Sequence, residues 1–294
     1  MLDILDYSEG IHEGYKNDGR ANGSFYPQGN VCRFCERKLI TVFSKGITEY
    51  DPENKDSRQD IHHYVTAQPC NCGWWTVKDI QTPDAHNSYA PAEWVFSYRG
   101  ALRTFSPADV TVPMDSLRRA IATHPDVINS IDPYKMEDLV GAVMTDFWPG
   151  AKCKHCGRSN DGGIDLILVN GDKPFAIQVK RRSRSNKGES VHHVTHFIGA
   201  LMLAGIPDGI FVTTADHFTG AAEKAAASVL ESGLVDTFQL IDRKPFLEML
   251  EATTKNLSNP WLSCIPKVLR LDESDSGLTP YSVCLRPPSA DSTS

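Results

Sequence analysis

The sequence predicts an α/β protein with a mixed β-sheet core flanked by helices, preceded by a small zinc-ribbon-like β module. Strand and helix patterns alternate from residue 133 to residue 241, which is typical of a layered sheet. Residues 164–169 and 174–180 read as a hairpin around an Asn-Gly-Asp turn. The module is indicated by two close cysteine pairs between residues 31 and 77.

The length, composition and net charge limit which classes of protein the chain can belong to. The chain has 294 residues, of which 40% are hydrophobic, so it can bury the core of an ordinary domain and a smaller one. It has no run of 18 apolar residues, and its first thirty residues lack a signal-peptide pattern, so we expect a soluble, cytoplasmic protein without membrane contact. The net charge of -7 means that any nucleic-acid contact has to come from a local basic patch.

The N-terminal part is expected to contain a lead-in and a zinc module. Residues 1–30 are rich in Gly, Asn and Asp without periodicity and predict an irregular segment. Residues 31–80 carry two cysteine doublets between short strands at 39–43 and 74–77. Four thiolates are a natural structural zinc site for a segment too short for an apolar core. The predicted zinc ligands are Cys32, Cys35, Cys70 and Cys72.

Residues 81–130 predict a linker and a helical connector. The apolar run 94–98 favours a strand that ends at Gly100, and residues 114–123 form a short amphipathic helix pattern. The main domain is expected to follow over residues 131–255.

The main domain opens with a helix at residues 133–147. Asp132 followed by Pro133 is a cap and first-turn signal, and apolar residues recur at helical spacing after it. Glu137 lies at the edge of this apolar stripe, where it could lean toward Asp165 on the neighbouring sheet.

The predicted hairpin carries polar residues inside apolar strands. With a turn of two or four residues, Asp165 lies opposite Gln178 or Ala176, and alternation places Asp165, Gln178 and Lys180 on one face. An acid, an amide oxygen and an ammonium on a rigid sheet can place a hard divalent cation and a positive charge around one phosphate.

The elements after the hairpin complete the sheet. Helices are expected at 190–203 and 220–231 and strands at 209–214 and 237–241, so the later half of the sheet should be parallel. Residues 256–294, rich in Ser, Asp and Pro toward the end, predict a flexible tail.

A basic run leaves the second hairpin strand directly. It is either a solvated loop or a set of contacts to flanking phosphates, and its place beside the polar site favours nucleic-acid binding. The residues concerned are Arg181, Arg182, Arg184 and Lys187.

Several neighbouring residues leave alternatives open. Asp161 is a rival to Asp165, although its place before two glycines favours a turn. The histidine cluster at 192–196 is either a zinc pair or an exposed helix face, and the Cys153 doublet either completes a second metal site or holds ordinary thiols. Glu189 is either a cap-region acid or a residue that supports the site.

The order of these features resembles one family. A helix with Glu137, then Asp-Gly-Gly-Ile-Asp, Gln-Val-Lys and a strand ending in Thr-Thr resembles the Mrr-like restriction endonucleases, a branch of the PD-(D/E)xK nuclease superfamily. The resemblance covers about residues 132–242. It implies a restriction-endonuclease-like fold and says nothing firm about the cysteine module or the tail.

The resemblance also implies roles. Asp165 would be a metal ligand, Gln178 would stand in the place of the second acidic ligand, and Lys180 would be the catalytic lysine. Glu137 would be the helix acid of the family pattern. The cofactor implied is Mg²⁺, or Mn²⁺, for catalysis, beside structural Zn²⁺ in the module.

We therefore expect a metal-dependent endonuclease that hydrolyses DNA, and the family implies restriction or anti-phage defence. The alternatives are a non-catalytic nucleic-acid-binding or scaffold subunit of a defence complex, and the same hydrolysis on RNA. Cutting both strands requires two active sites, so a homo-oligomer, dimer or higher, or an assembly with a motor or sensor protein is expected.

Overall fold

The chain divides into two units in the computed structural model, which describes residues 2–17, 31–32, 34–49, 61–83, 93–156 and 163–265. Unit 1 comprises Met1–Leu5 and Thr104–Leu257, and unit 2 comprises Asp6–Arg103 and Ser258–Ser294. Two short strands, β1 (Ile4–Asp6) and β7 (Arg103–Phe105), pair with each other. In the described part of the chain, no helix has the length and apolarity needed to cross a membrane.

Unit 2 is built on a five-stranded antiparallel sheet with the order β2-β6-β5-β4-β3. Val65, Val77 and Trp75 form its buried side, and Trp261 of the short 3-10 helix η2 packs into the same core. The strands are β2 (Gly10–Asn17), β3 (Phe43–Glu49), β4 (Ile61–Pro69), β5 (Trp75–Pro83) and β6 (Glu93–Gly100), and η2 covers Pro260–Cys264.

Unit 2 differs from the sequence prediction at its edges. The lead-in is not wholly irregular, because Gly10–Asn17 forms β2 and pairs with β6. Gly14 allows this pairing, since a Cβ there would lie 2.9 Å from the ring of Phe96. The strand predicted at 39–43 begins only at Phe43. The expected tail holds η2, and residues 266–294 lie outside the described residues.

Unit 1 contains a five-stranded mixed sheet with the order β12-β11-β10-β9-β8. β8, β9 and β10 are antiparallel, whereas β10, β11 and β12 are parallel, which confirms a mixed sheet that is parallel in its later half. The strands are β8 (Lys152–His155), β9 (Leu166–Asn170), β10 (Lys173–Lys180), β11 (Asp208–Thr213) and β12 (Thr237–Ile241).

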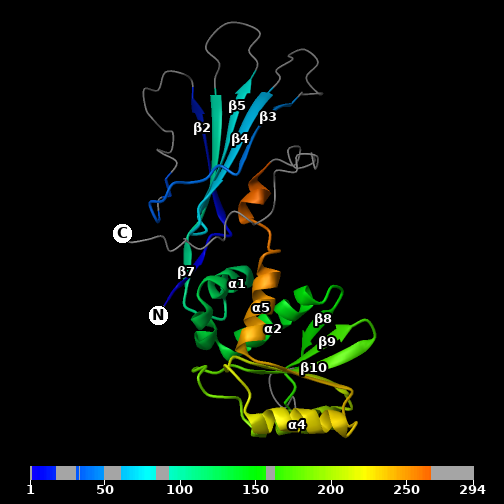
Figure 1. The fold of residues 1–294 in the computed structure, drawn as a ribbon. Helices are drawn as coiled ribbons and strands as arrows, with labels where there is room; N and C mark the ends of the chain where they lie inside the picture. The colour runs from blue at the N-terminus through cyan, green and yellow to red at the C-terminus, as the bar shows by residue number, and fades with distance from the viewer. Residues whose placement is uncertain are drawn as a thin grey trace, which may run out of the picture. The chain divides into compact units, whose positions relative to one another are not determined.

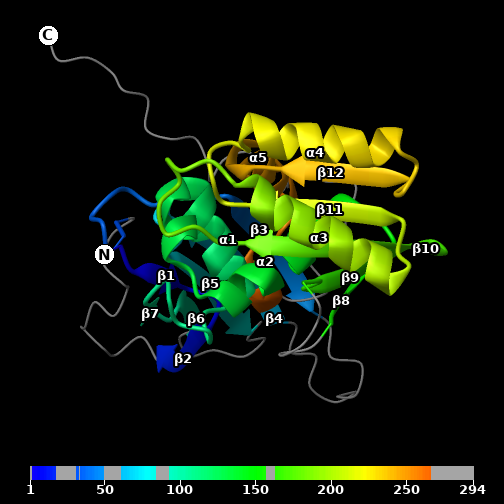
Figure 2. The same cartoon turned by 90° about the horizontal axis from the view of Figure 1, so that it is seen from below.

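Helices cover both faces of the unit 1 sheet. One buried cluster joins α1, α2 and α5 to the sheet, and a second joins α3 and α4 to its other face. Figure 1 shows α2 and α5 on one side of β10 and α4 on the other, and Figure 2 shows α3 beside α4. The helices are α1 (Met114–Thr123), η1 (Pro125–Ser130), α2 (Pro133–Phe147), α3 (Val191–Ala204), α4 (Gly220–Glu231) and α5 (Arg243–Thr254).

Local signals explain where two of these helices begin. Asp132 Oδ1 accepts hydrogen bonds from the N–H groups of Tyr134 and Lys135 at 2.9 and 3.3 Å, which caps α2 as predicted. Helix α5 was not predicted. Its cap is Asp242, which accepts from Lys244, and its buried Phe246 and Leu250 lie one turn apart.

Candidate functional site

The hairpin of β9 and β10 forms with a two-residue turn. Gly171 takes φ +64 there, a backbone conformation that suits glycine. Ile177 pairs with Leu166, so Gln178 follows opposite Asp165, which directly precedes β9. The Asp165 N–H donates to the Ile177 carbonyl at 2.9 Å, so the backbone ladder fixes the position of this carboxylate.

Asp165, Gln178 and Lys180 share one face of the sheet, as alternation predicted. Ile177 and Val179 belong to the core on the α2 side, whereas Ala176 packs on the α3 side. Gln178 and Lys180 therefore lie on the α3 side.

The carboxylate of Asp165 and the amide of Gln178 are in direct contact. Gln178 Nε2 donates to Asp165 Oδ2, and the Val179 N–H donates to the same oxygen at 2.6 Å. Gln178 is only 2% exposed and Asp165 is half-buried, so the pair lies largely out of water.

Lys180 lies at the end of β10, beside Thr213 of β11. Its carbonyl accepts hydrogen bonds from the Thr214 N–H and the Thr213 hydroxyl, each at 3.1 Å. The side chain is half-buried, and no acid within the described residues forms an ion pair with it. Lys180 therefore lies on the same face of the sheet as Gln178, two residues further along β10.

Glu137 reaches the edge of the same sheet from α2. Its Oε2 lies 3.6 Å from Nδ1 of His155, and its side chain is 19% exposed. His155 belongs to β8 and pairs with Leu166, the residue after Asp165. Glu137 is therefore placed near the strand end that carries Asp165.

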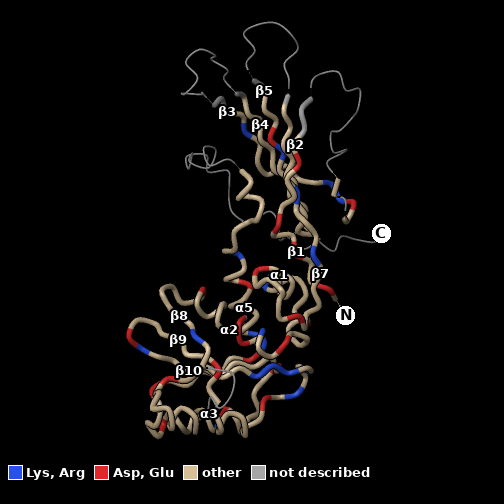
Figure 3. Tube along the Cα trace, turned by 180° about the vertical axis from the view of Figure 1, so that it is seen from behind, with Lys and Arg blue, Asp and Glu red and all other residues tan. Residues whose placement is uncertain are grey.

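The basic run after β10 appears as blue stretches of the chain in Figure 3. Its side chains have two kinds of surroundings. Arg181 Nη1 donates to the Asn129 carbonyl at 2.8 Å, and the guanidinium of Arg182 bonds to Glu189. Arg184 and Lys187 are exposed. Sequence reasoning treated the four residues alike, because the partners of Arg181 and Arg182 lie in other elements.

Glu189 is the centre of a buried polar network. It is 0% exposed and accepts hydrogen bonds from Arg182 Nε at 2.9 Å and from the Thr213 hydroxyl at 2.9 Å. His193 Nδ1 lies 2.7 Å from its other oxygen. Burial alone would raise the pKa of Glu189, but the hydrogen bonds from Arg182 and Thr213 and the charges of Arg182 and His193 lower it below its usual range. The carboxylate is thus held ionised.

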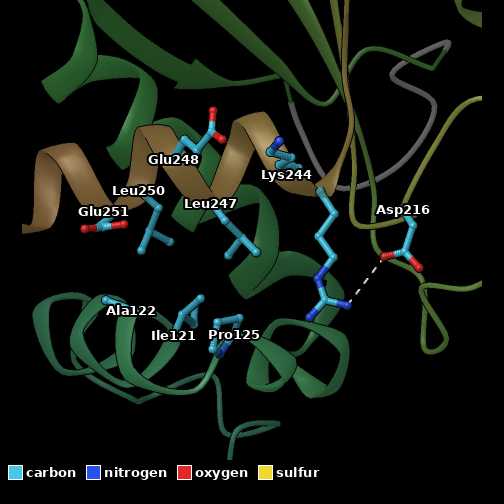
Figure 4. Close-up of a pocket in the computed structure, with 10 residues that line it drawn as sticks. Ile121, Ala122, Pro125, Asp216, Lys244, Leu247, Glu248, Leu250 and Glu251 are labelled. Carbon is cyan, nitrogen blue, oxygen red and sulfur yellow. Dashed lines mark ion pairs between the residues drawn. The ribbon is translucent and has the colours of Figure 1, made fainter. Parts of the chain in front are cut away.

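This network ties the basic loop to the loop after β11. The Glu189 N–H donates to the His217 carbonyl, and the Asp216 N–H donates to the Ser185 carbonyl. Arg243 begins α5, and its Nη1 lies 3.6 Å from Oδ1 of Asp216, while its Nη2 forms an ion pair with Asp126. Arg243 also lines a pocket of about 390 Å³ between α1 and α5 (Figure 4).

His196 lies beside the Asp165 and Gln178 pair, which sequence reasoning did not foresee. Gly163 has φ +98, and a Cβ there would lie 3.1 Å from Nδ1 of His196 and 3.4 Å from Oε1 of Gln178. The imidazole and the amide oxygen therefore both lie within 3.4 Å of the position that a Cβ would take at residue 163. The rival ligand Asp161 lies outside the described residues.

The predicted cysteines of unit 2 come together. Their Sγ atoms all lie within 4.8 Å of one another, with Cys35 at 3.3 Å from Cys70 and Cys32 at 3.6 Å from Cys72. This cluster could hold a metal ion, and four thiolates are a common ligand set of structural zinc sites. Gly73, at φ +97, closes the second cysteine turn.

Cys153 and Cys156 do not join a metal cluster of this kind among the described residues. Burial raises the pKa of Cys153 to about 11, and its sulfur packs against Gly141 of α2. A thiol with that pKa stays protonated near neutral pH, which favours a packing role.

Comparisons with known proteins address the main domain. Residues 128–250 match the family model Mrr_cat, described as a restriction endonuclease. This span is less than half of the chain. It includes α2, the β9–β10 hairpin and every residue of the Glu189 network.

Comparisons with curated proteins and with solved structures do not extend the family match. No curated protein matched the chain. A crystal structure titled as a protein of unknown function, AF1548, is similar over 50% of this chain and 79% of its own, with 16% identity and a TM-score of 0.34.

Proposed function

We propose that the chain is a metal-dependent endonuclease that hydrolyses DNA phosphodiester bonds, because residues 128–250 match the Mrr_cat restriction endonuclease model. The observation that carries the proposal is the placement of Asp165, Gln178 and Lys180 on one face of the β9–β10 hairpin. Restriction or anti-phage defence is the role that this family implies.

The donor set fits a hard divalent cation. Asp165 supplies a carboxylate and Gln178 an amide oxygen, and both are ligands that Mg²⁺ and Mn²⁺ accept. Gln178 directs its amide nitrogen toward Asp165 and its oxygen toward Gly163. A half turn of that amide presents its oxygen beside the carboxylate. Glu137 can hydrogen-bond waters at the same strand end.

The bound cation would neutralise phosphate charge and lower the pKa of a coordinated water. The chain itself supplies Lys180, which orients the attacking water and stabilises the negative charge that grows on the phosphoryl oxygens. A preorganised donor of this kind contributes about 3 kcal/mol to transition-state stabilisation. Backbone pairing of β10 with β11 fixes the position from which this side chain projects.

The proposed DNA contacts come from the exposed part of the basic loop. Arg184 and Lys187 can bind flanking phosphates, whereas Arg181 and Arg182 hold the loop through Asn129 and Glu189. This narrows the set of four basic residues that the sequence suggested. We propose that the four-cysteine unit binds structural Zn²⁺ and either reads DNA or docks a partner.

The test is cleavage of supercoiled plasmid with Mg²⁺, with Mn²⁺ and with chelator. Lys180→Ala is compared with Lys173→Ala, which changes an exposed lysine at the other end of the same strand. Metal-dependent nicking or linearisation should vanish in the first variant and persist in the second. Equal cleavage by both variants would remove Lys180 from the mechanism, and absence of cleavage by the wild type would favour a non-catalytic binding subunit.

A further inference from the structure

We propose that His196 is a positioning residue that orients the amide of Gln178 for metal binding. This inference rests on the proposed nuclease function and adds a residue to its site. The observation behind it is that the His196 ring and the Gln178 amide oxygen lie 3.1 and 3.4 Å from the same point, the position that a Cβ would take at residue 163.

The orientation of the Gln178 amide has to change before its oxygen can bind a metal ion. The amide has two ends, and in this structure its nitrogen donates to Asp165. For Asp165 and Gln178 to present oxygens to the same cation, the amide has to turn so that its nitrogen faces the other way. Gln178 is 2% exposed, so that nitrogen cannot rely on bulk water for an acceptor.

His196 offers the acceptor. Its Nδ1 lies 3.1 Å from the Cβ position of residue 163, and the turned amide nitrogen would take the place of Oε1, 3.4 Å from the same position. A neutral imidazole accepts a hydrogen bond at the nitrogen that carries no proton. His196 comes from α3 and Gln178 from β10, so the packing of this helix on the sheet sets their spacing.

Gly163 makes the arrangement sterically possible. A side chain at this position would approach both the imidazole and the amide, at 3.1 and 3.4 Å. The glycine thus keeps open the space in which the amide turns. Partners behind metal ligands commonly change metal affinity by about 10- to 100-fold when they are removed.

The experiment is Mn²⁺ titration of the zinc-loaded full chain by calorimetry, without DNA. His196→Ala should weaken Mn²⁺ binding by about tenfold or more. His192→Ala is the matched control, because His192 is exposed one turn earlier on the same helix. His196→Asn, which restores an acceptor on a shorter side chain, should recover part of the loss.

The same titration in a Gln178→Glu background separates positioning from other roles. A carboxylate has an oxygen at either end and needs no orienting partner, so adding His196→Ala there should change Mn²⁺ affinity by less than about twofold. A loss that persists in this background would overturn the proposal and make His196 a direct ligand or a structural residue. Unchanged affinity in His196→Ala alone would also overturn it.

Failure of the proposed function gives a different result. If the wild type binds no Mn²⁺, or if Asp165→Asn binds Mn²⁺ as tightly as the wild type, the proposed metal site is wrong. The proposed role of His196 is then wrong as well. If Asp165→Asn abolishes binding and His196→Ala does not weaken it, only the inference about His196 is wrong.

Discussion

The buried carboxylate of Glu189 pairs with the guanidinium of Arg182 through both of its oxygens. Arg182 lies two residues after Lys180, the last residue of β10. Thr213 joins the two features, because its hydroxyl contacts both Glu189 and the Lys180 carbonyl. The charge pair therefore stabilises the strand end from which the proposed catalytic lysine projects.

Glu189→Gln should lower the free energy of unfolding by about 3 kcal/mol, because it leaves Arg182 without its buried partner charge. Urea-induced unfolding measures the change. Glu231→Gln, an exposed position at the end of α4, is the control and should stay within about 0.5 kcal/mol of the wild type. A Glu189 variant as stable as this control would mean that the network does not stabilise unit 1.

The stability difference between wild type and Glu189→Gln should depend on pH. The folded-state pKa of Glu189 lies below its ordinary value of 4.5, so its contribution is complete above about pH 5 and is lost as pH falls through the folded-state pKa. The difference in unfolding free energy between the two proteins should therefore shrink in acid. A difference that stays constant from pH 7 to pH 3 would contradict the lowered pKa.

Cys35→Ser should release the Zn²⁺ proposed for unit 2 and unfold residues 31–77, because structural zinc sites contribute about 10 kcal/mol or more of folding free energy. Elemental analysis gives the zinc content, and limited proteolysis reports whether residues 131–255 stay folded. Cys156→Ser, at an exposed cysteine outside the cluster, should keep its zinc. Loss of zinc in both variants would point to a second site.

The sequence predicted the hairpin well because its information is local. The Asn-Gly-Asp turn and the alternation of apolar residues specify which face carries Asp165 and Gln178. Strand β2 escaped prediction because its pairing with β6 joins residues far apart in the chain, and two of its residues are glycines.

The roles of Glu189 and His196 could not be decided from the sequence for the same reason. Glu189 fits a cap-region acid as well as a residue that supports the site until Thr213 and Arg182 close around it. His196 is one of three helix histidines in the sequence, and only the packing of α3 brings it close to Gly163. Side-chain spacing within one element was visible in the sequence, whereas the contacts between elements were not.

Asp165→Asn should abolish metal-dependent cleavage and keep DNA binding, because it removes a ligand charge and leaves the basic loop unchanged. Plasmid cleavage and DNA binding by fluorescence anisotropy measure the two properties. The variant should bind DNA at least as tightly as the wild type, since a negative charge near the phosphates is gone. Continued cleavage would make Asp161 the better candidate for the ligand.

Arg184 and Lys187 should contribute to the salt dependence of DNA binding. In the Asp165→Asn background, replacing either residue by alanine should weaken binding to all sequences and reduce the slope of log affinity against log salt by about 1. Lys224→Ala, at an exposed position on α4, is the control and should leave the slope unchanged. An unchanged slope in the Arg184 and Lys187 variants would place the DNA elsewhere.

Gly163→Ala should destroy cleavage through crowding rather than through loss of stability. Both Gly163 and Gly171 have positive φ, +98 and +64, so alanine strains the backbone at either position by roughly 1–2 kcal/mol. Only at position 163 does the new methyl group meet His196 and the Gln178 amide, whereas Gly171 has nothing within 4 Å. Gly171→Ala should therefore lose similar stability in urea and still cut plasmid. If the two variants cut equally well, the space over Gly163 is not required for the chemistry.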